Sequence, residues 1–171
     1  MNYQERSGNN ILIKIIAAVA GLAAGFIICR TAFLSFTMPD ASMEPNLKKD
    51  DLVIILRHVT PRKGDIILFK SPAEPGRVLV RRIAAVEGDT VEIKDRVFRV
   101  NNGACEFPWK TRSTDRRIFP MNFTFRDNMH AVKIGRGSYF VLSDDLDRGF
   151  DSRTFGPIPE DLVIGRMIYK Y

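Results

Sequence analysis

The sequence predicts a mostly β domain of antiparallel strands, preceded by one apolar helix at the N-terminus. Between residues 51 and 171, short runs rich in β-branched and aromatic residues alternate with glycine and proline turns, and few helical periods interrupt them. Ahead of them, residues 11–36 form an apolar block that only Lys14 and Arg30 interrupt. The chain of 171 residues is long enough for one such domain with a short appendage, and too short for two ordinary domains.

The apolar block predicts a membrane-spanning helix over residues 11–29. Fifteen uncharged residues run from Ile15 to Cys29, and the segment approaches the roughly 20 residues that a bilayer requires if Lys14 extends its charge to the interface. A cleavable signal peptide and a buried core helix are the alternatives. We favour an uncleaved anchor, because an apolar stretch of 26 residues is long for a signal peptide and the next elements follow it directly.

The flanking charges predict the orientation of this helix. Arg6 and Lys14 against Glu5 favour a cytoplasmic N-terminus. We therefore expect residues 1–36 to form a cytoplasmic tail and a single-pass anchor in the plasma membrane. Residues 37–171 would then form an extracytoplasmic domain.

Short apolar runs predict the strands of that domain in order. Each run is rich in β-branched or aromatic residues and ends at a turn. Residues 104–136 are polar, aromatic and irregular, and we expect them to be the most variable insertion. The expected strands cover residues 51–56, 66–69, 78–80, 138–142 and 161–171, with a hairpin over residues 91–100 that closes on residues 101–103.

The net charge of +6, with a pI near 9.5, narrows the classes of partner. Lys and Arg are scattered, and no helix-turn-helix, RRM signature or zinc spacing accompanies them, so we expect no nucleic-acid partner. Attraction to lipid headgroups fits a tethered domain better. Two histidines, His58 and His130, are too few for a metal site, no glycine-rich phosphate loop is present, and we expect no cofactor. Two cysteines, Cys29 and Cys105, give no disulfide framework.

The most informative motif follows the apolar block at residues 39–47, which read PDASMEPNL. A serine followed by Met, one variable residue and Pro resembles the nucleophile box of the type I signal peptidases, which are membrane-anchored serine proteases that cut signal peptides from exported proteins. The resemblance continues over residues 81–91 (RRIAAVEGDTV) and 143–156 (SDDLDRGFDSRTFG), in the family's order, and covers about residues 10–171. It implies a domain of coiled antiparallel β-sheets with the site beside an apolar surface.

Ser42 is the candidate nucleophile of this box. A serine hydroxyl is a poor nucleophile at neutral pH and needs a base within hydrogen-bond reach, which Ser–Lys dyads supply as a lysine whose pKa is lowered by burial. A serine just past a membrane anchor also lies where the scissile bond of a membrane-inserted substrate lies. The resemblance assigns Met43 and Pro45 to substrate binding. The alternative is that Ser42 only forms a turn between Pro39 and Pro45.

The family's catalytic lysine falls on Arg81. A guanidinium has a pKa above about 12 and is not deprotonated in proteins, so Arg81 can hold Ser42 or stabilise an oxyanion but cannot accept the serine proton. Asp40 lies where several relatives carry a serine of the oxyanion hole. A carboxylate there repels developing negative charge, which leaves the Ser42 backbone N–H as one donor. We expect an ion pair between Asp40 and Arg81 to fill this space.

The last of the three motifs, residues 143–156, which we call the last box, supplies the expected supports of the site. Gly149 falls where the family usually has a serine that supports the lysine. Asp144, Asp151 and Arg153 match the family's pattern, which implies that the second aspartate and the arginine are structural supports near the site. A bidentate Asp–Arg pair is a suitable clamp for a loop.

Together these motifs predict a serine endopeptidase, either a type I signal peptidase or a close pilin-processing relative. The resemblance implies cleavage after small residues, with signal peptides or prepilin-like exported proteins as substrates and membrane lipid as a further partner. Arg81, Asp40 and Gly149 leave an alternative open. The chain would then be a catalytically impaired family member that acts as a membrane-anchored binding or assembly factor for exported or pilus proteins. A self-cleaving DNA-binding repressor is discounted, because an apolar anchor replaces any helix-turn-helix.

Overall fold

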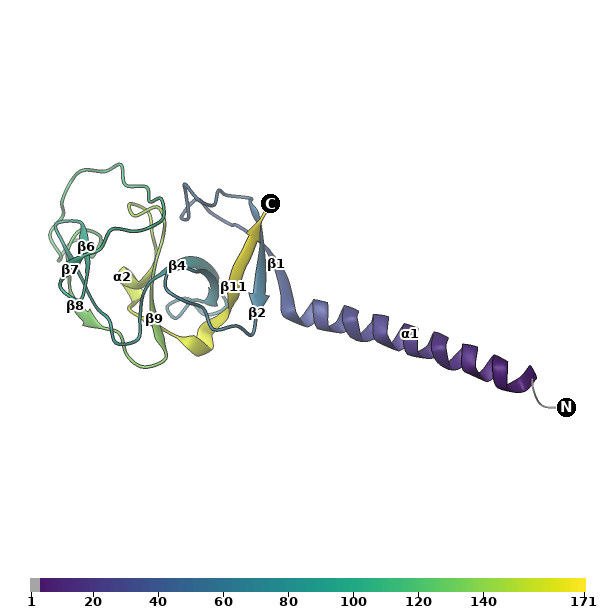
Figure 1. Ribbon diagram of the computed structural model, residues 1–171. Helices are drawn as coiled ribbons and strands as arrows, with labels where there is room; N and C mark the ends of the chain where they lie inside the picture. Colours follow the sequence, from purple (N-terminus) through teal and green to yellow (C-terminus); the bar gives the residue numbers. More distant parts are fainter. Residues whose placement is uncertain (1–3) are drawn as a thin grey trace. The chain divides into compact units, whose positions relative to one another are not determined.

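The computed structural model describes residues 4–171 (Figure 1), which divide after Leu34 into two compact units. The N-terminal unit is the helix α1 (Gln4–Ala32). Within it, Ile13–Ala32 form a 20-residue segment with a mean hydropathy of 2.0, long and apolar enough to cross a membrane. The predicted N-terminal apolar helix is therefore confirmed, and it extends beyond residues 11–29 at both ends.

The second unit, from Ser35 to Tyr171, is built from two β-sheets, as the sequence predicts. The first has seven strands in the order β1-β2-β11-β3-β4-β9-β10, and the second has four in the order β7-β6-β5-β8. Every neighbouring pair with a described register is antiparallel. The strands are β1 (Phe33–Thr37), β2 (Leu52–Arg57), β3 (Ile66–Lys70), β4 (Val78–Val86), β5 (Thr90–Lys94), β6 (Val97–Val100), β7 (Gly103–Ala104), β8 (Met129–Lys133), β9 (Ser138–Leu142), β10 (Ile158–Pro159) and β11 (Val163–Lys170). Two short helical elements, α2 (Ser152–Phe155) and η1 (Glu160–Leu162), lie between β9 and β11.

The strand β4 is longer than the sequence analysis predicts. The expected strand ends at Val80, but β4 continues to Val86 and pairs with β3 on one side and β9 on the other. Arg81 and Arg82 are therefore consecutive residues of a central strand, and their side chains point to opposite faces of the sheet. This alternation places Arg81 at the candidate site and Arg82 at its support.

The hairpin predicted over residues 91–100 is present as β5 and β6, with its turn at Asp95 and Arg96. Both turn residues have positive φ, 50° and 69°, as a two-residue turn that matches the strand twist requires. The segment 104–136 is irregular over most of its length, but it contains β8, which pairs with β5. The sequence analysis misses β8 because only Met129 of its five residues is buried, which leaves no clear alternation.

A core cluster fixes the loop that carries the nucleophile motif. Met38, Met43 and Leu47 are each at most 1% exposed, and they pack with buried side chains of β2, β3 and β4. Burying a side chain of this size contributes about 1.5–3 kcal/mol. Three such anchors within ten residues hold the loop in one position against the sheet.

Candidate active site

The predicted nucleophile Ser42 lies in a turn that the core and the last box both hold. Its neighbour Met43 is fully buried, and the N–H of Leu47 donates to the carbonyl of Met43 at 2.8 Å. The carbonyl of Ser42 accepts a hydrogen bond from the N–H of Asp145 at 2.9 Å. The first and last boxes, about one hundred residues apart in the sequence, therefore meet at the backbone of the serine.

Arg81 reaches Ser42 from β4 (Val78–Val86). Its Nη1 donates to Ser42 Oγ at 2.8 Å and to the carbonyl of Val80 at 2.6 Å, while its Nε donates to the carbonyl of Phe150 at 3.0 Å. Ser42 is 7% exposed and Arg81 is 2% exposed. The structure thus brings together the serine of the first box and the residue at the family's lysine position, within direct hydrogen-bond distance.

The expected ion pair between Asp40 and Arg81 is not formed in residues 4–171. Asp40 instead accepts the backbone N–H of Ser42 on its Oδ1 at 2.9 Å. The N–H that the sequence analysis leaves for an oxyanion is therefore already occupied by a carboxylate. Asp40 and Arg81 still attract each other through space without contact.

Burial and charge act in opposite directions on both groups. Burial lowers the pKa of Arg81, and the charges of Asp151 and Asp40 partly restore it. Burial raises the pKa of Asp40, but hydrogen bonds from the Ser42 side chain and backbone, together with the charges of Arg81 and Arg77, outweigh it and hold that pKa below its usual value. The carboxyl is thus ionised, and the guanidinium stays protonated because arginine does not lose its proton in proteins.

The predicted clamp between Asp151 and Arg153 is present. Arg153 donates from Nε and Nη2 to the two oxygens of Asp151 at 2.9 and 2.7 Å, and Asp151 is fully buried. Asp151 also caps α2 (Ser152–Phe155) by accepting the Arg153 N–H, and it accepts the N–H of Ser143 at 3.0 Å. The pair therefore ties the end of β9 to α2, next to Phe150, whose carbonyl Arg81 contacts.

Gly149 has no room for a side chain. A Cβ at this position would collide with Asp151 Oδ2, Ser143 Oγ and Arg153 Nη2. The Ser143 hydroxyl is itself buried with no hydrogen-bond partner in the described part of the chain. A serine that supports a lysine, as the family usually has here, cannot be introduced into this chain without displacing the Asp151–Arg153 clamp.

Asp144, the other predicted support, is held by residues that the sequence analysis does not identify. Arg82 donates from Nε and Nη2 to its two oxygens at 2.8 and 2.7 Å, and Asn46 Nδ2 donates to Oδ2 at 2.8 Å. The guanidinium of Arg82 lies over the ring of Trp109, 5.1 Å from its centroid. The sequence did offer one signal for Arg82, which is that it matches the family motif at residues 81–91.

Residues 109–113, which we call the strap, lie against the nucleophile loop. The carbonyl of Lys110 accepts Asn46 Nδ2 at 2.7 Å, and the N–H of Arg112 donates to the carbonyl of Asp144 at 2.8 Å. Arg112 also forms an ion pair with Glu44, the variable residue of the nucleophile motif. The strap belongs to the segment expected to be a variable insertion, so nothing in the sequence indicated that it touches the site.

The two residues assigned to substrate binding differ in exposure. Pro45 is exposed, whereas the Met43 side chain is fully buried in the core. In this conformation Met43 has no surface to offer a substrate, and its contacts explain the position of the loop instead.

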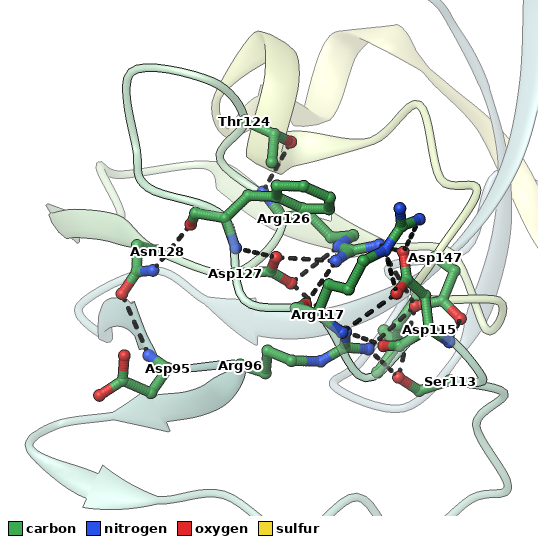
Figure 2. Close-up of polar contacts among 12 residues, drawn as sticks. Asp95, Arg96, Ser113, Asp115, Arg117, Thr124, Arg126, Asp127, Asn128 and Asp147 are labelled. Carbon is green, nitrogen blue, oxygen red and sulfur yellow. Dashed lines mark hydrogen bonds and ion pairs between the residues drawn. The ribbon is translucent and has the colours of Figure 1, made fainter.

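The remainder of the segment 104–136 is ordered by a network of ion pairs (Figure 2), which we call the insert network. Asp127 is fully buried and pairs with Arg126 at 2.7 Å. The network comprises the ion pairs Arg126–Asp115 at 2.9 Å, Arg117–Asp115 at 2.8 Å and Arg96–Asp147 at 2.9 Å. Arg96 also lies 3.7 Å from Asp127, and Arg126 lies 3.8 Å from Asp147, so the insertion is fastened to the turn of the β5–β6 hairpin and to the last box.

Comparison with known proteins points to one family. The family described as signal peptidase, peptidase S26, matches residues 10–171. Signal peptidase I V of Bacillus subtilis (strain 168) is 28% identical over 158 residues, which are 88% of this chain and 92% of that protein. The chloroplastic thylakoidal processing peptidase 1 of Arabidopsis thaliana is 30% identical over 149 residues, which are 79% of this chain but only 41% of that relative's own length. A solved signal peptidase I from Enterococcus faecalis V583 matches with a TM-score of 0.49 and 25% identity, covering 64% of this chain and 98% of that one.

Proposed function

Because the chain belongs to the signal peptidase family, peptidase S26, we propose that it is a membrane-bound serine endopeptidase that removes signal peptides from exported proteins, with Ser42 as its nucleophile. The observation that carries the proposal is the 2.8 Å contact between Ser42 Oγ and Arg81 Nη1. It joins the family's nucleophile and lysine positions at the separation that a Ser–Lys dyad requires. Substrates would be the signal peptides of exported proteins or prepilin-like proteins, cut after small residues.

The proposed enzyme is slower than one with a Ser–Lys dyad. Arg81 cannot accept the proton of Ser42, and loss of a general base lowers the rate by about 10²–10⁴-fold. Arg81 remains suited to hold the hydroxyl and to stabilise an oxyanion. Asp151 and Arg153 would keep the Phe150 carbonyl in place for Arg81.

The proposed location is the plasma membrane, with residues 1–36 as cytoplasmic tail and anchor and residues 37–171 as an extracytoplasmic catalytic domain. The apolar length of Ile13–Ala32 and the flanking charges support this topology. Asn102 is exposed, so an Asn102→Cys variant in a background lacking Cys105 can be labelled from outside intact cells. Absence of labelling, or a mature N-terminus near residue 30, would contradict the topology.

A second candidate function is favoured by the charges around Ser42. Arg81 stands where a base is needed, and Asp40 occupies the N–H of Ser42. A chain with such a site could bind signal peptides or pilus proteins without cutting them, as a membrane-anchored binding or assembly factor.

A cleavage assay separates the two candidates. The full chain in detergent micelles is incubated with a peptide that carries an Ala-x-Ala signal-peptide site, with Ser42→Ala as the control. We expect slow cleavage after the small residue, absent in Ser42→Ala. Substrate binding without cleavage would support the binding factor, and equal cleavage by Ser42→Ala would refute the nucleophile.

A further inference from the structure

Two charged side chains contact Ser42 in the described part of the chain, and they differ in what they can do with a proton. Arg81 donates to the Ser42 hydroxyl oxygen, and Asp40 accepts from the Ser42 backbone N–H. The Ser42 side chain and N–H both help to hold the pKa of Asp40 below its usual value. Of the two, only the carboxylate can accept a proton.

We propose that Asp40 is the general base for Ser42 and takes the place of the missing lysine. The inference rests on the proposed function, because it assigns a role in cleavage by Ser42. It gives the site a charge arrangement opposite to that of a Ser–Lys dyad. The base is an anion before proton transfer, and the cation beside it never loses its charge.

The hydrogen-bond geometry at Ser42 is compatible with this role. A hydroxyl has one proton to donate and two lone pairs to accept with. Since Ser42 Oγ accepts from Arg81 Nη1, its own proton is directed away from the guanidinium. The Asp40 carboxylate is the acceptor that we assign to that proton, because its bond to the Ser42 N–H at 2.9 Å fixes it on the same residue.

The charged groups around Asp40 determine how strong a base it is. Arg81 faces it from β4, and Arg77 faces it from the turn before that strand; behind Arg81 lie Asp151 and its partner Arg153. The two arginines facing Asp40 favour its ionised form, so the carboxylate is present at neutral pH but is a weak base. A weak base far from its optimal pKa gives slow proton transfer, which agrees with the low rate expected for this site.

The proton and electron balance of the step is complete without a co-reactant. The Ser42 hydroxyl proton passes to an oxygen of Asp40 while Oγ bonds to the scissile carbonyl carbon and the carbonyl π pair moves to its oxygen. Collapse of this intermediate breaks the C–N bond, and Asp40 returns the proton to the leaving amine. Water then adds to the acyl carbon by the same transfer to Asp40, and the proton returns to Ser42 Oγ as the acid product leaves.

These proton transfers also remove the repulsion that a carboxylate at the oxyanion position would cause. Proton transfer neutralises Asp40 as negative charge appears on the substrate oxygen, so the site carries one negative charge throughout. Arg81 lies beside both positions and stabilises the charge in either. A carboxylate that could not accept the proton would instead add a second negative charge.

The test is Asp40→Asn in the full chain, assayed with the Ala-x-Ala peptide. Asparagine keeps an oxygen that can accept the Ser42 N–H, so the loop contact is preserved while the base is removed. We expect kcat/KM to fall by about 10²–10⁴-fold. Asp161→Asn is the matched control: it removes an exposed carboxylate outside the site and should leave the rate unchanged.

The pH profile separates a catalytic from a structural role. If Asp40 is the base, kcat/KM is flat from neutral to alkaline pH and falls only in acid, below the ordinary pKa of an aspartate, as the carboxylate is protonated. A rate that rises through alkaline pH, or an Asp40→Asn variant that keeps both rate and profile while Ser42→Ala is inactive, overturns Asp40 as the base and leaves the proposed function standing. A wild-type chain that does not cleave and whose Ser42 resists a fluorophosphonate probe overturns both.

Discussion

The insert network and the Ser42 site use arginine in opposite ways. In the network, Arg96, Arg117 and Arg126 each contact a carboxylate at 2.7–2.9 Å. At the site, the guanidinium of Arg81 contacts a hydroxyl and two carbonyl oxygens, and no ion pair joins it to a carboxylate within residues 4–171. Both regions fasten distant segments together, but only the network neutralises its cations by contact.

The difference shows where the fold retains unneutralised charge. A buried cation without a contacting anion is unfavourable, and the chain avoids this for Arg153 by the bidentate pair with Asp151. Arg81 is buried too, yet the opposite charges that act on it, Asp151 and Asp40, do so only through space. Perturbed charges of this kind are concentrated at functional sites, which distinguishes the Ser42 site from a structural ion pair.

The strongest test of the charges at the Ser42 site replaces Arg81 and Asp40 singly and together. Asp40→Ser alone should lower kcat/KM by about 10²–10⁴-fold, because it removes the base. In the Arg81→Lys background the same change should raise kcat/KM, because the carboxylate no longer keeps the lysine charged and a desolvated lysine can act as base. The cleavage assay across all four combinations checks this reversal of sign. If Asp40→Ser raises the rate in both backgrounds, the carboxylate only inhibits.

Removing the charge of Asp151 tests the structural role of the ion pair that neutralises the buried Arg153. Asp151→Asn leaves Arg153 buried without its counter-ion and should lower the free energy of unfolding by about 3–5 kcal/mol. Denaturant unfolding of residues 35–171, followed within the full chain, measures it. Glu74→Gln breaks the exposed Arg77–Glu74 pair and is the matched control, with an expected loss below about 1 kcal/mol. Equal losses in the two variants would contradict the clamp.

Acid should weaken the insert network through the protonation of Asp147. Burial raises the pKa of Asp147, but hydrogen bonds from Asp115, Thr114 and Arg96 lower it to about 2. A carboxyl whose pKa is lowered by folding stabilises the fold fully at pH values above its pKa in the unfolded chain, near 4. This stabilisation is lost as the pH falls through the pKa in the folded chain. Water screens these pairs, so we expect a loss of about 1 kcal/mol, roughly 2–4 °C in Tm, between pH 4 and pH 2.

Thermal unfolding at a series of pH values measures this loss. Asp147→Asn should lower the Tm at neutral pH and reduce its dependence on acid. The network has no role in stability if wild type and variant lose the same number of degrees between pH 4 and pH 2.

The smallest expected effect concerns the ion pair between Glu44 and Arg112, which joins the nucleophile loop to the strap. Because both side chains are partly exposed, Glu44→Gln should change kcat/KM by about fivefold or less. The exchange of charges, Glu44→Arg with Arg112→Glu, should recover part of the loss if the pair positions the loop. Lys63→Gln, at a surface pair with Asp89 that includes neither Ser42 nor a strap residue, is the control. Failure of the exchange together with an unaffected single variant would exclude a positioning role.

Local patterns were sufficient to predict the helix and the antiparallel strands, and the resemblance of the motifs to the family predicted the meeting of Ser42 with the residue at the family's lysine position. The apolar length of residues 11–36 and the punctuation of the strands are short-range signals that tertiary contacts did not override. The ion pair expected between Asp40 and Arg81 was wrong, because the Ser42 N–H lies two residues from Asp40 and offers a local hydrogen bond.

The parts that could not be predicted depend on long-range contacts. The strap reaches Asn46 across 64 residues, and Arg82 reaches Asp144 across 62. Neither separation leaves a periodic pattern in the sequence. The lack of room at Gly149 likewise arises from three side chains that only the folded chain brings together.

The chain contains a single tryptophan, and the fold places it beside the site. Trp109 lies in the strap, stacked on Phe107 with ring centroids 4.9 Å apart and packed against the guanidinium of Arg82. Arg82 in turn holds Asp144, which holds the nucleophile loop through Asn46. The tryptophan fluorescence of the unmodified protein therefore comes from one indole that is three contacts from that loop, through Arg82 and Asp144 to Asn46. Peptide binding that shifts the loop will change the emission without any attached dye, and the same signal can be followed in variants that do not cleave.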